Sequence, residues 1–210
     1  MMDSSPEPSG RLVRLASASD MATLSRLLVQ LYACEVPGML RGDRDMQTEL
    51  ARRLLSSAPL GRRYVVVHDA EVVAMGSLAT RAEPRPATPP GVLLAFPSIL
   101  GVRDALGSYA GVLRAMLTVA APPAVAEAQI HSVVVDVDAR GNGAGTLLMA
   151  CLERQATALG NKRATLQVLA SNSTARAFYR ARGYVDKGPP HGRVRTALAL
   201  PSILMYKNIV

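Results

Sequence analysis

The sequence predicts a domain of the mixed α/β (α+β) class, and three observations lead to this class. Segments with the period of a strand alternate with segments with the period of a helix along the chain. Residues 64–75 have the pattern of a β-hairpin. Over 130–169 a strand, a glycine-rich loop, a helix and a second strand follow one another, which is the order of a parallel crossover.

The 210 residues are expected to form a short tail and a single domain. Residues 1–10 are rich in Ser, Pro and acidic residues, so we expect a flexible tail, and they lack the basic start and apolar centre of a signal peptide. The domain covers 11–210. No uncharged run reaches the roughly 18 residues that a membrane helix needs, so we expect a cytoplasmic protein without a membrane partner.

The N-terminal half predicts a strand, two helices and the hairpin. Residues 11–16 alternate in polarity as a strand does. The helix that follows is expected to end at a Pro-Gly pair, and its apolar stripe consists of Leu24, Leu27, Leu28 and Leu31. A second, short helix is expected over 47–56. The hairpin joins 64–68 to 71–75 through an Asp-Ala turn.

The stretch 81–127 differs from the rest and is expected to be an elaboration on the core domain. It holds seven of the fourteen prolines, is apolar, and is expected to contain a helix over 102–119. Such a segment could roof a small pocket or form the surface of a homodimer.

The C-terminal half continues the alternation of strands and helices. Its expected elements are a strand over 130–135, a helix over 146–159, a strand over 164–169, a helix over 171–182, and strands over 196–200 and 203–208.

Composition narrows the function classes. The formal net charge of +8 would suit a nucleic-acid surface, but Trp is absent, only two Phe occur and no dense basic run exists, so no nucleic-acid partner is expected. The charge also suits a small polyanionic ligand. Cys34 and Cys151 are expected to be core thiols. The histidines His68, His131 and His191 are scattered without metal-ligand spacing, so no metal site is expected.

The glycine-rich loop before the helix 146–159 has the character of an anion site. Amide groups at the start of a helix have no internal partner, and glycines let phosphate oxygens approach the backbone. A dinucleotide would require G-x-G-x-x-G and an acid at the end of the next strand, whereas this loop reads G-x-G-x-G and 164–169 ends without a carboxylate. The pyrophosphate of coenzyme A is the ligand that we favour.

Two motifs that follow one another along the chain resemble those of the GCN5-related N-acetyltransferase (GNAT) superfamily. The first is Arg140-x-x-Gly143-x-Gly145 after the strand 130–135. The second reads Asn172-x-x-Ala175-x-x-Phe178-Tyr179-x-x-x-Gly183-Tyr184, and residues 204–208 are similar to the family's final strand. The resemblance implies a mixed, mostly antiparallel central sheet flanked by helices, in which two parallel strands splay after Val135 to admit the cofactor.

The activity that the resemblance implies is that of an acetyl-CoA-dependent N-acetyltransferase. The acetyl group would pass to a primary amine by direct attack in a ternary complex. We favour a small-molecule amine because the segment 81–127 carries few acids that would attract a polycationic acceptor. A protein N-terminal or lysine acetyltransferase, and a non-catalytic CoA-binding regulatory module, are the alternatives.

The resemblance also assigns residues to the cofactor. The backbone at Val133, Val134 and Val135 would pair with the pantetheine arm and polarise the thioester carbonyl. Asn172 would hold a pantetheine amide. The other cofactor-binding residues are expected to be Arg140, Gly141, Asn142, Gly143, Ala144, Gly145, Thr146, Arg176, Phe178 and Tyr179.

The chemistry requires an acid for the departing thiolate and a base for the acceptor ammonium. Tyr179 is the expected acid, since a phenol with a pKa of about 10 stays protonated at neutral pH; a packed aromatic is the plainer interpretation. Gln129 stands where many family members carry a glutamate. His131 is the expected base, because alternation places it on one face with Gln129, Val133 and Val135. Glu35, Glu127, or no dedicated base at all remain alternatives.

Overall fold

The computed structural model describes residues 10–87, 89–118, 121–189 and 199–209. In this part of the chain a seven-stranded sheet has the order β1-β2-β3-β4-β5-β7-β6, and every neighbouring pair is antiparallel except β4 and β5. The strands are β1 (Arg11–Leu15), β2 (Arg63–His68), β3 (Glu71–Thr80), β4 (Glu127–Val135), β5 (Arg163–Leu169), β6 (Val185–Gly188) and β7 (Ser202–Asn208). The mixed, mostly antiparallel sheet flanked by helices is therefore confirmed.

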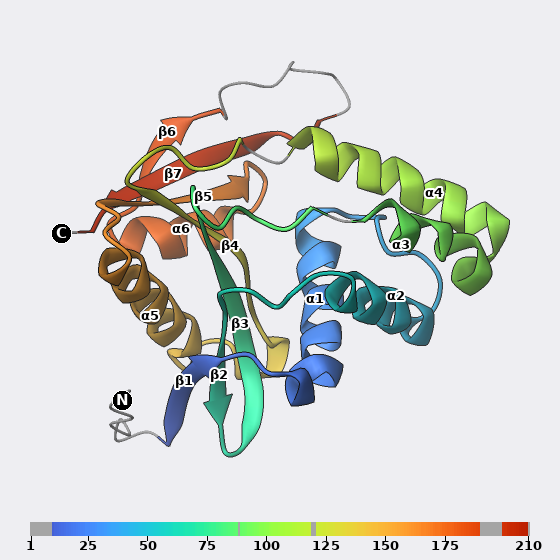
Figure 1. Ribbon diagram of the computed structural model, residues 1–210, viewed down its shortest axis with the longest axis horizontal. Helices are drawn as coiled ribbons and strands as arrows, with labels where there is room; N and C mark the ends of the chain where they lie inside the picture. The colour runs from blue at the N-terminus through green and yellow to red at the C-terminus, as the bar shows by residue number, and fades with distance from the viewer. Residues whose placement is uncertain (1–9, 88, 119–120, 190–198, 210) are drawn as a thin grey trace.

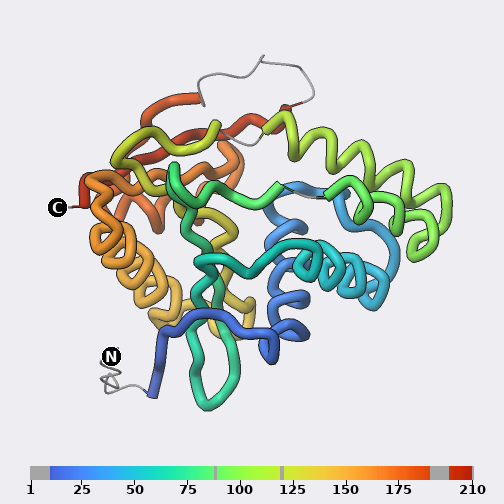
Figure 2. The backbone as a smooth tube through the Cα atoms, viewed as in Figure 1, coloured from blue at the N-terminus to red at the C-terminus, as the bar shows by residue number. Residues whose placement is uncertain are grey.

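Helices cover both faces of the sheet, as Figure 1 shows. One face carries α1 (Met21–Glu35) and α2 (Arg44–Ser56), and the other carries α5 (Ala144–Ala158) and α6 (Ser173–Ala181). The backbone tube in Figure 2 shows the same two layers, with the blue and cyan helices opposite the orange ones. No helix in the described ranges combines the length and the apolar character that a membrane span would need.

The apolar periodicity of the N-terminal helices is confirmed. The predicted stripe of four leucines is buried on α1, where it packs against Val65, Met75 and Val134 of the sheet. The second helix, α2, begins three residues before its expected start, because the side chain of Asp43 accepts a hydrogen bond from the Met46 amide and caps the helix there.

The Pro-rich segment contains helices that pack beside α2 and reach the sheet at their C-terminal end, where Gln167 of β5 donates to the carbonyl of Thr118 (Figure 1). They are α3 (Pro90–Leu94) and α4 (Phe96–Thr118). Leu50 of α2 is buried against Phe96 and Leu100. Gly101 has φ 74° and ψ 163°, so α4 is broken there and its regular part begins at the expected residue 102. Residue 119, the expected end, lies outside the described residues, as do nine of the ten residues of the predicted tail.

The C-terminal expectations met different outcomes. The strand expected over 203–208 is β7, while most of the strand expected over 196–200 lies outside the described residues. β6 was not predicted, because its sequence Val-Asp-Lys-Gly is short and has little apolar character. It pairs with β7, which therefore lies between β5 and β6.

The parallel strands part earlier than expected. β4 and β5 are paired from Glu127–Arg163 to Ile130–Leu166 only. The splay therefore begins after Ile130, and not after Val135 as predicted. Beyond Ile130, His131, Val134 and Val135 remain paired with β3, whereas the other edge of β4 has no partner strand among the described residues.

Candidate active site

A β-bulge in β4 decides which side chains face the opening between the parallel strands. The register between β3 and β4 shifts between Met75–Val134 and Ser77–His131, and Ser132 has φ 54°. His131 lies on the α1 side with Gln129, as expected. However, Val133 and Val135 pack with the cluster beneath α5, on the opposite face. The prediction that all four share one face is therefore wrong beyond Ser132, because the bulge reverses the alternation.

The glycine-rich loop leads directly into the first turn of α5. Gly143 precedes the helix with φ 83°, a left-handed conformation that glycine adopts without strain, and it offers no side chain to cap the helix amides. The amides of Ala144, Gly145 and Thr146 therefore have no partner inside the helix. A Cβ on Gly145 would lie 3.3 Å from Val135 and 3.4 Å from Phe178. This bare backbone cradle fits a pyrophosphate.

Two arginines flank the loop. The side chain of Arg140 donates from Nε to the carbonyl of Val135 over 3.3 Å, so it fastens the loop to the end of β4. Arg11 of β1 donates to the carbonyl of Asn142 and lies 3.5 Å from the position of a Cβ on Gly143. Arg11 could not be predicted as part of this site, because 131 residues separate it from Asn142 along the chain. Both place positive charge beside the cradle.

The second motif forms α6, and most of its polar side chains have structural partners. Asn172 caps the helix by accepting from the Ala175 amide, which leaves its NH₂ group to donate to a ligand. Arg176 donates to the carbonyl of Ala170 and lies 3.5 Å from Asp186. Phe178 packs against the first turn of α5. The cofactor roles of these residues stay predictions.

Tyr179 is buried where α6 meets the sheet. Its ring packs edge-on against Phe178 and Tyr184, with centroids 5.4 and 5.9 Å away. Burial raises the pKa of the Tyr179 phenol well above its ordinary value, and the charge of Glu35 raises it further. The hydroxyl therefore keeps its proton at neutral pH, as a proton donor must. Its catalytic role stays a prediction.

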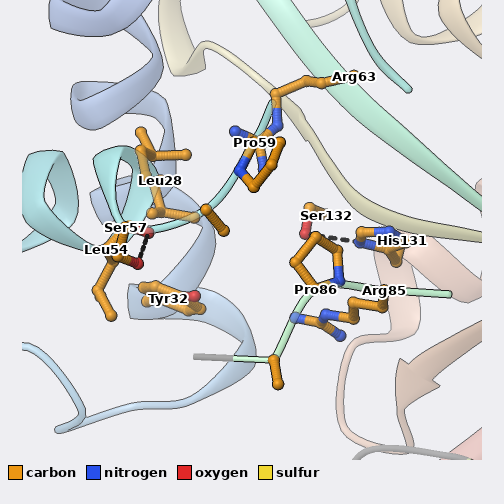
Figure 3. A pocket seen from close by; sticks show the side chains of 13 residues that line it. Leu28, Tyr32, Leu54, Ser57, Pro59, Arg63, Arg85, Pro86, His131 and Ser132 are labelled. Atoms are coloured by element: carbon orange, nitrogen blue, oxygen red, sulfur yellow. Dashed lines mark hydrogen bonds between the residues drawn. The ribbon is translucent and has the colours of Figure 1, made fainter. Parts of the chain in front are cut away.

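A pocket of about 90 Å³ opens on the α1 side of the sheet and brings His131 together with residues from four distant segments (Figure 3). Its apolar wall comes from Leu28 and Tyr32 of α1 and from Leu54 and Leu55 of α2. The remaining lining residues are Ser57, Ala58, Pro59, Arg63, Arg85, Pro86, Ala87, His131 and Ser132. None of the lining side chains is acidic.

Two arginines of this pocket, Arg63 and Arg85, argue against His131 as the base. Burial lowers the pKa of its imidazole to about 3, and the charges of Arg85 and Arg63 contribute to this shift. The imidazole is therefore neutral at physiological pH. Such a low pKa makes it a weak base, poorly suited to take a proton from the acceptor ammonium. His131 contacts Ser132 Oγ through Nδ1 at 3.1 Å.

Glu35, one of the alternative bases considered from the sequence, suits the role of general base better than His131 does. It is the last residue of α1 and is partly buried. Burial raises the pKa of its carboxyl to about 7, against the opposing charge of Arg85. A carboxylate with this pKa can accept a proton near neutral pH. Its charge also raises the pKa of the Tyr179 hydroxyl, so the two groups interact electrostatically.

Glu127, another alternative base, is engaged in ion pairs away from the opening between the parallel strands. Its carboxylate forms ion pairs with Arg163 at 2.9 Å and with Lys187 at 3.7 Å. It lies at the start of β4, where the parallel strands are still paired, and not at the opening between them. Within the described residues, no cluster of three His, Cys, Asp or Glu side chains could hold a metal ion.

Comparison with known proteins agrees with this geometry. Residues 28–184 match the family model described as Acetyltransferase (GNAT) family, which is about three quarters of the chain. No curated protein sequence gave a match.

Solved structures show the same fold at low sequence identity. "The crystal structure of acetyltransferase" matches with a TM-score of 0.58 and 22% identity, covering 95% of this chain and 100% of that chain. The ribosomal-protein-alanine N-acetyltransferase from Brucella melitensis matches with a TM-score of 0.53 and 19% identity, over 94% and 99%. The structure of yncA from Salmonella typhimurium with its cofactor acetyl-CoA matches with a TM-score of 0.55 and 14% identity, over 96% and 95%.

Proposed function

The chain belongs to the acetyltransferase (GNAT) family, and from this premise we propose that it acetylates the primary amine of a small molecule by direct attack in a ternary complex. As a member of this family it is an acetyl-CoA-dependent N-acetyltransferase. The observation that carries the finer proposal is the pocket of about 90 Å³ on the α1 side, which has an apolar wall and no acidic side chain. A cavity of this size suits a small head group, and its two arginines disfavour a polycationic peptide.

The cradle at the start of α5 would hold the pyrophosphate. The amides of Gly145 and Thr146 point outward there, and the helix dipole adds positive potential. The free edge of β4 beyond Ile130 would pair with the pantetheine arm. Bound acetyl-CoA supplies the acetyl group as a thioester.

Two side chains would manage the protons. Glu35, with a pKa of about 7, accepts the proton of the acceptor ammonium, directly or through water. Tyr179 holds its proton firmly at Oη and is the group that donates to the departing thiolate. The apolar wall of α1 and α2 would limit water in the acceptor pocket itself.

Thermal unfolding with and without acetyl-CoA tests the cofactor site, with NAD as the control. Acetyl-CoA at 100 times its Kd should stabilise the fold by about 2.7 kcal/mol, and NAD should not. A panel of small amines, an N-terminal peptide and a lysine peptide, scored by release of free thiol, then tests the acceptor. Faster turnover of a peptide would move the assignment to a protein acetyltransferase. Cofactor binding without turnover of any acceptor would favour a regulatory module.

The homodimer and the cytoplasmic location stay predictions. Large apolar side chains are exposed along α4, among them Val102 at 70%, Leu106 at 64% and Met116 at 60%. Such exposure is compatible with a dimer surface. Sedimentation at micromolar protein concentration would decide between a monomer and a dimer.

A further inference from the structure

Arg63 and Arg85 approach the same cavity from different parts of the chain. Arg63 begins β2, and Arg85 follows β3 in the Pro-rich segment. Both line the pocket on the α1 side and also an adjoining cavity of about 60 Å³, so they stand where the two cavities meet. In Figure 3 the guanidinium of Arg85 extends toward the Tyr32 side of the pocket.

Both arginines are held in place. The Nε of Arg63 donates to Ser77 Oγ on the neighbouring strand, at 3.2 Å. The segment that carries Arg85 is fastened by Glu83, whose carboxylate pairs with Arg62 at 2.8 Å and whose amide donates to Thr80 Oγ1. The guanidinium of Arg63 is therefore held without a ligand, and the chain is fastened two residues before Arg85.

Neither guanidinium has a carboxylate partner. Among the described residues, the ion pair nearby is that of Arg62 with Glu83, and none includes Arg63 or Arg85. Burial lowers the pKa of Arg63, and repulsion from Arg85 lowers it further. Arg63 is half-buried and Arg85 is exposed, and the positive charge of Arg85 disfavours the charged form of Arg63. A bound anion would offset this repulsion.

We propose that Arg63 and Arg85 together bind an oxyanion carried by the acceptor, so that the acceptor is a small amine that also bears a carboxylate or a similar acid group. This inference rests on the proposed function and narrows its substrate class. Guanidinium groups bind carboxylates and phosphates through paired hydrogen bonds.

The position of Glu35 sets how the acceptor lies. The charge of Arg85 acts on Glu35 as well as on His131 and Tyr32. The anion site therefore adjoins the group that takes the ammonium proton, and an acceptor with its amine and acid a few bonds apart, as in an α-amino acid, spans both. The apolar wall formed by Leu28, Leu54 and Leu55 then receives a hydrophobic side group.

The experiment compares matched acceptors that differ only in the acid. Amino acids such as leucine are tested against their decarboxylated amines, such as 3-methylbutylamine, at saturating acetyl-CoA. The wild-type protein should prefer the acid-bearing member by tenfold or more in kcat/KM. Arg85→Gln and Arg63→Gln should each raise KM for the acid-bearing member about tenfold without changing the KM of acetyl-CoA. Each variant should lower the preference for the acid-bearing member over its decarboxylated amine by about the same factor, a ratio from which any change in the pKa of Glu35 cancels.

Arg52→Gln is the matched control, since it removes an exposed guanidinium of α2 that is paired with Glu49 and lines neither cavity. Arg85 is exposed, so Arg85→Gln still tests the inference if Arg63→Gln fails to fold. Equal turnover of both members of each pair, or an equal effect of Arg52→Gln, would overturn the inference alone. Stabilisation by acetyl-CoA with neither turnover nor calorimetric binding of any acid would overturn it too. Absence of any acetyl-CoA binding would instead remove the proposed function on which it rests.

Discussion

At the scale of single residues, burial moves the proton affinities of the site in directions that suit acyl transfer. It raises the pKa of the Tyr179 phenol, so the proton stays in place, and it raises the pKa of Glu35 to about 7. It lowers the pKa of His131 to about 3. The same low dielectric environment thus favours the neutral form of each group.

Replacing Tyr179 by phenylalanine removes one oxygen and leaves the ring packing against Phe178 and Tyr184. Because the phenol is the expected proton donor, we expect kcat to fall about 100-fold. Stabilisation by acetyl-CoA, measured by thermal unfolding, should remain. Unchanged turnover would show that Tyr179 only packs.

The activity of the wild-type protein should depend on the ionisation of Glu35. Its raised pKa means that the carboxyl is protonated below about pH 7 and ionised above it, so kcat/KM should rise through this value. Arg85 opposes the rise in the pKa of Glu35, and Glu35 in turn raises the pKa of the hydroxyls of Tyr32 and Tyr179. A pH profile of kcat/KM measures the inflection, which Glu35→Gln should abolish.

The control for this profile is His131→Gln. It should keep the inflection near pH 7, because the imidazole titrates far below that range. Loss of the inflection in this variant, with retention in Glu35→Gln, would restore His131 as the base that the sequence first suggested.

At the scale of elements, the start of α5 depends on one glycine conformation. Gly143 has φ 83° directly before the helix, and Gly160 has φ 79° directly after it. An alanine at either position would be strained by roughly 1–2 kcal/mol. Only the first position adjoins the cradle for the pyrophosphate.

The two glycines therefore form a matched pair for mutation. Gly143→Ala and Gly160→Ala should lower the free energy of unfolding by similar amounts, measured with urea. Only Gly143→Ala should raise the Kd of acetyl-CoA, tenfold or more, because its Cβ and the altered loop obstruct the amides. Equal Kd values in the two variants would contradict the assignment of the loop.

Periodicity and turn chemistry predicted most elements, because those signals are local. The leucine stripe of α1, the hairpin and the strand–loop–helix at Gly143 needed only neighbouring residues. The bulge at Ser132 could not be predicted, since it depends on how β3 pairs opposite it. Arg63 and Arg85 were missed for the same reason: neither lies in a motif, and only the folded chain brings them to His131.

At the scale of the whole molecule, the formal charge of +8 should accelerate the capture of polyanionic ligands. Mobile ions screen such attraction, with a Debye length of about 10 Å at 0.1 M. We expect the KM of acetyl-CoA to rise severalfold between about 0.05 and 0.5 M NaCl, while kcat changes little. Steady-state kinetics at a fixed acceptor concentration measures the KM of acetyl-CoA at each salt concentration. A KM that does not depend on salt would show that uncharged contacts dominate the affinity for acetyl-CoA.

In the described part of the chain the sheet consists of two half-sheets, β1–β4 and β5–β7–β6, and the strand pairs from Glu127–Arg163 to Ile130–Leu166 join them. A ligand lying along the free edge of β4 would act as the missing strand between them. Because a bound ligand stabilises the folded state, its supply would set the share of opened molecules that proteases can cut. We expect the lifetime of this protein in a cell to lengthen when acetyl-CoA is plentiful and to shorten when it is scarce, so that its abundance follows the nutritional state without any change in synthesis.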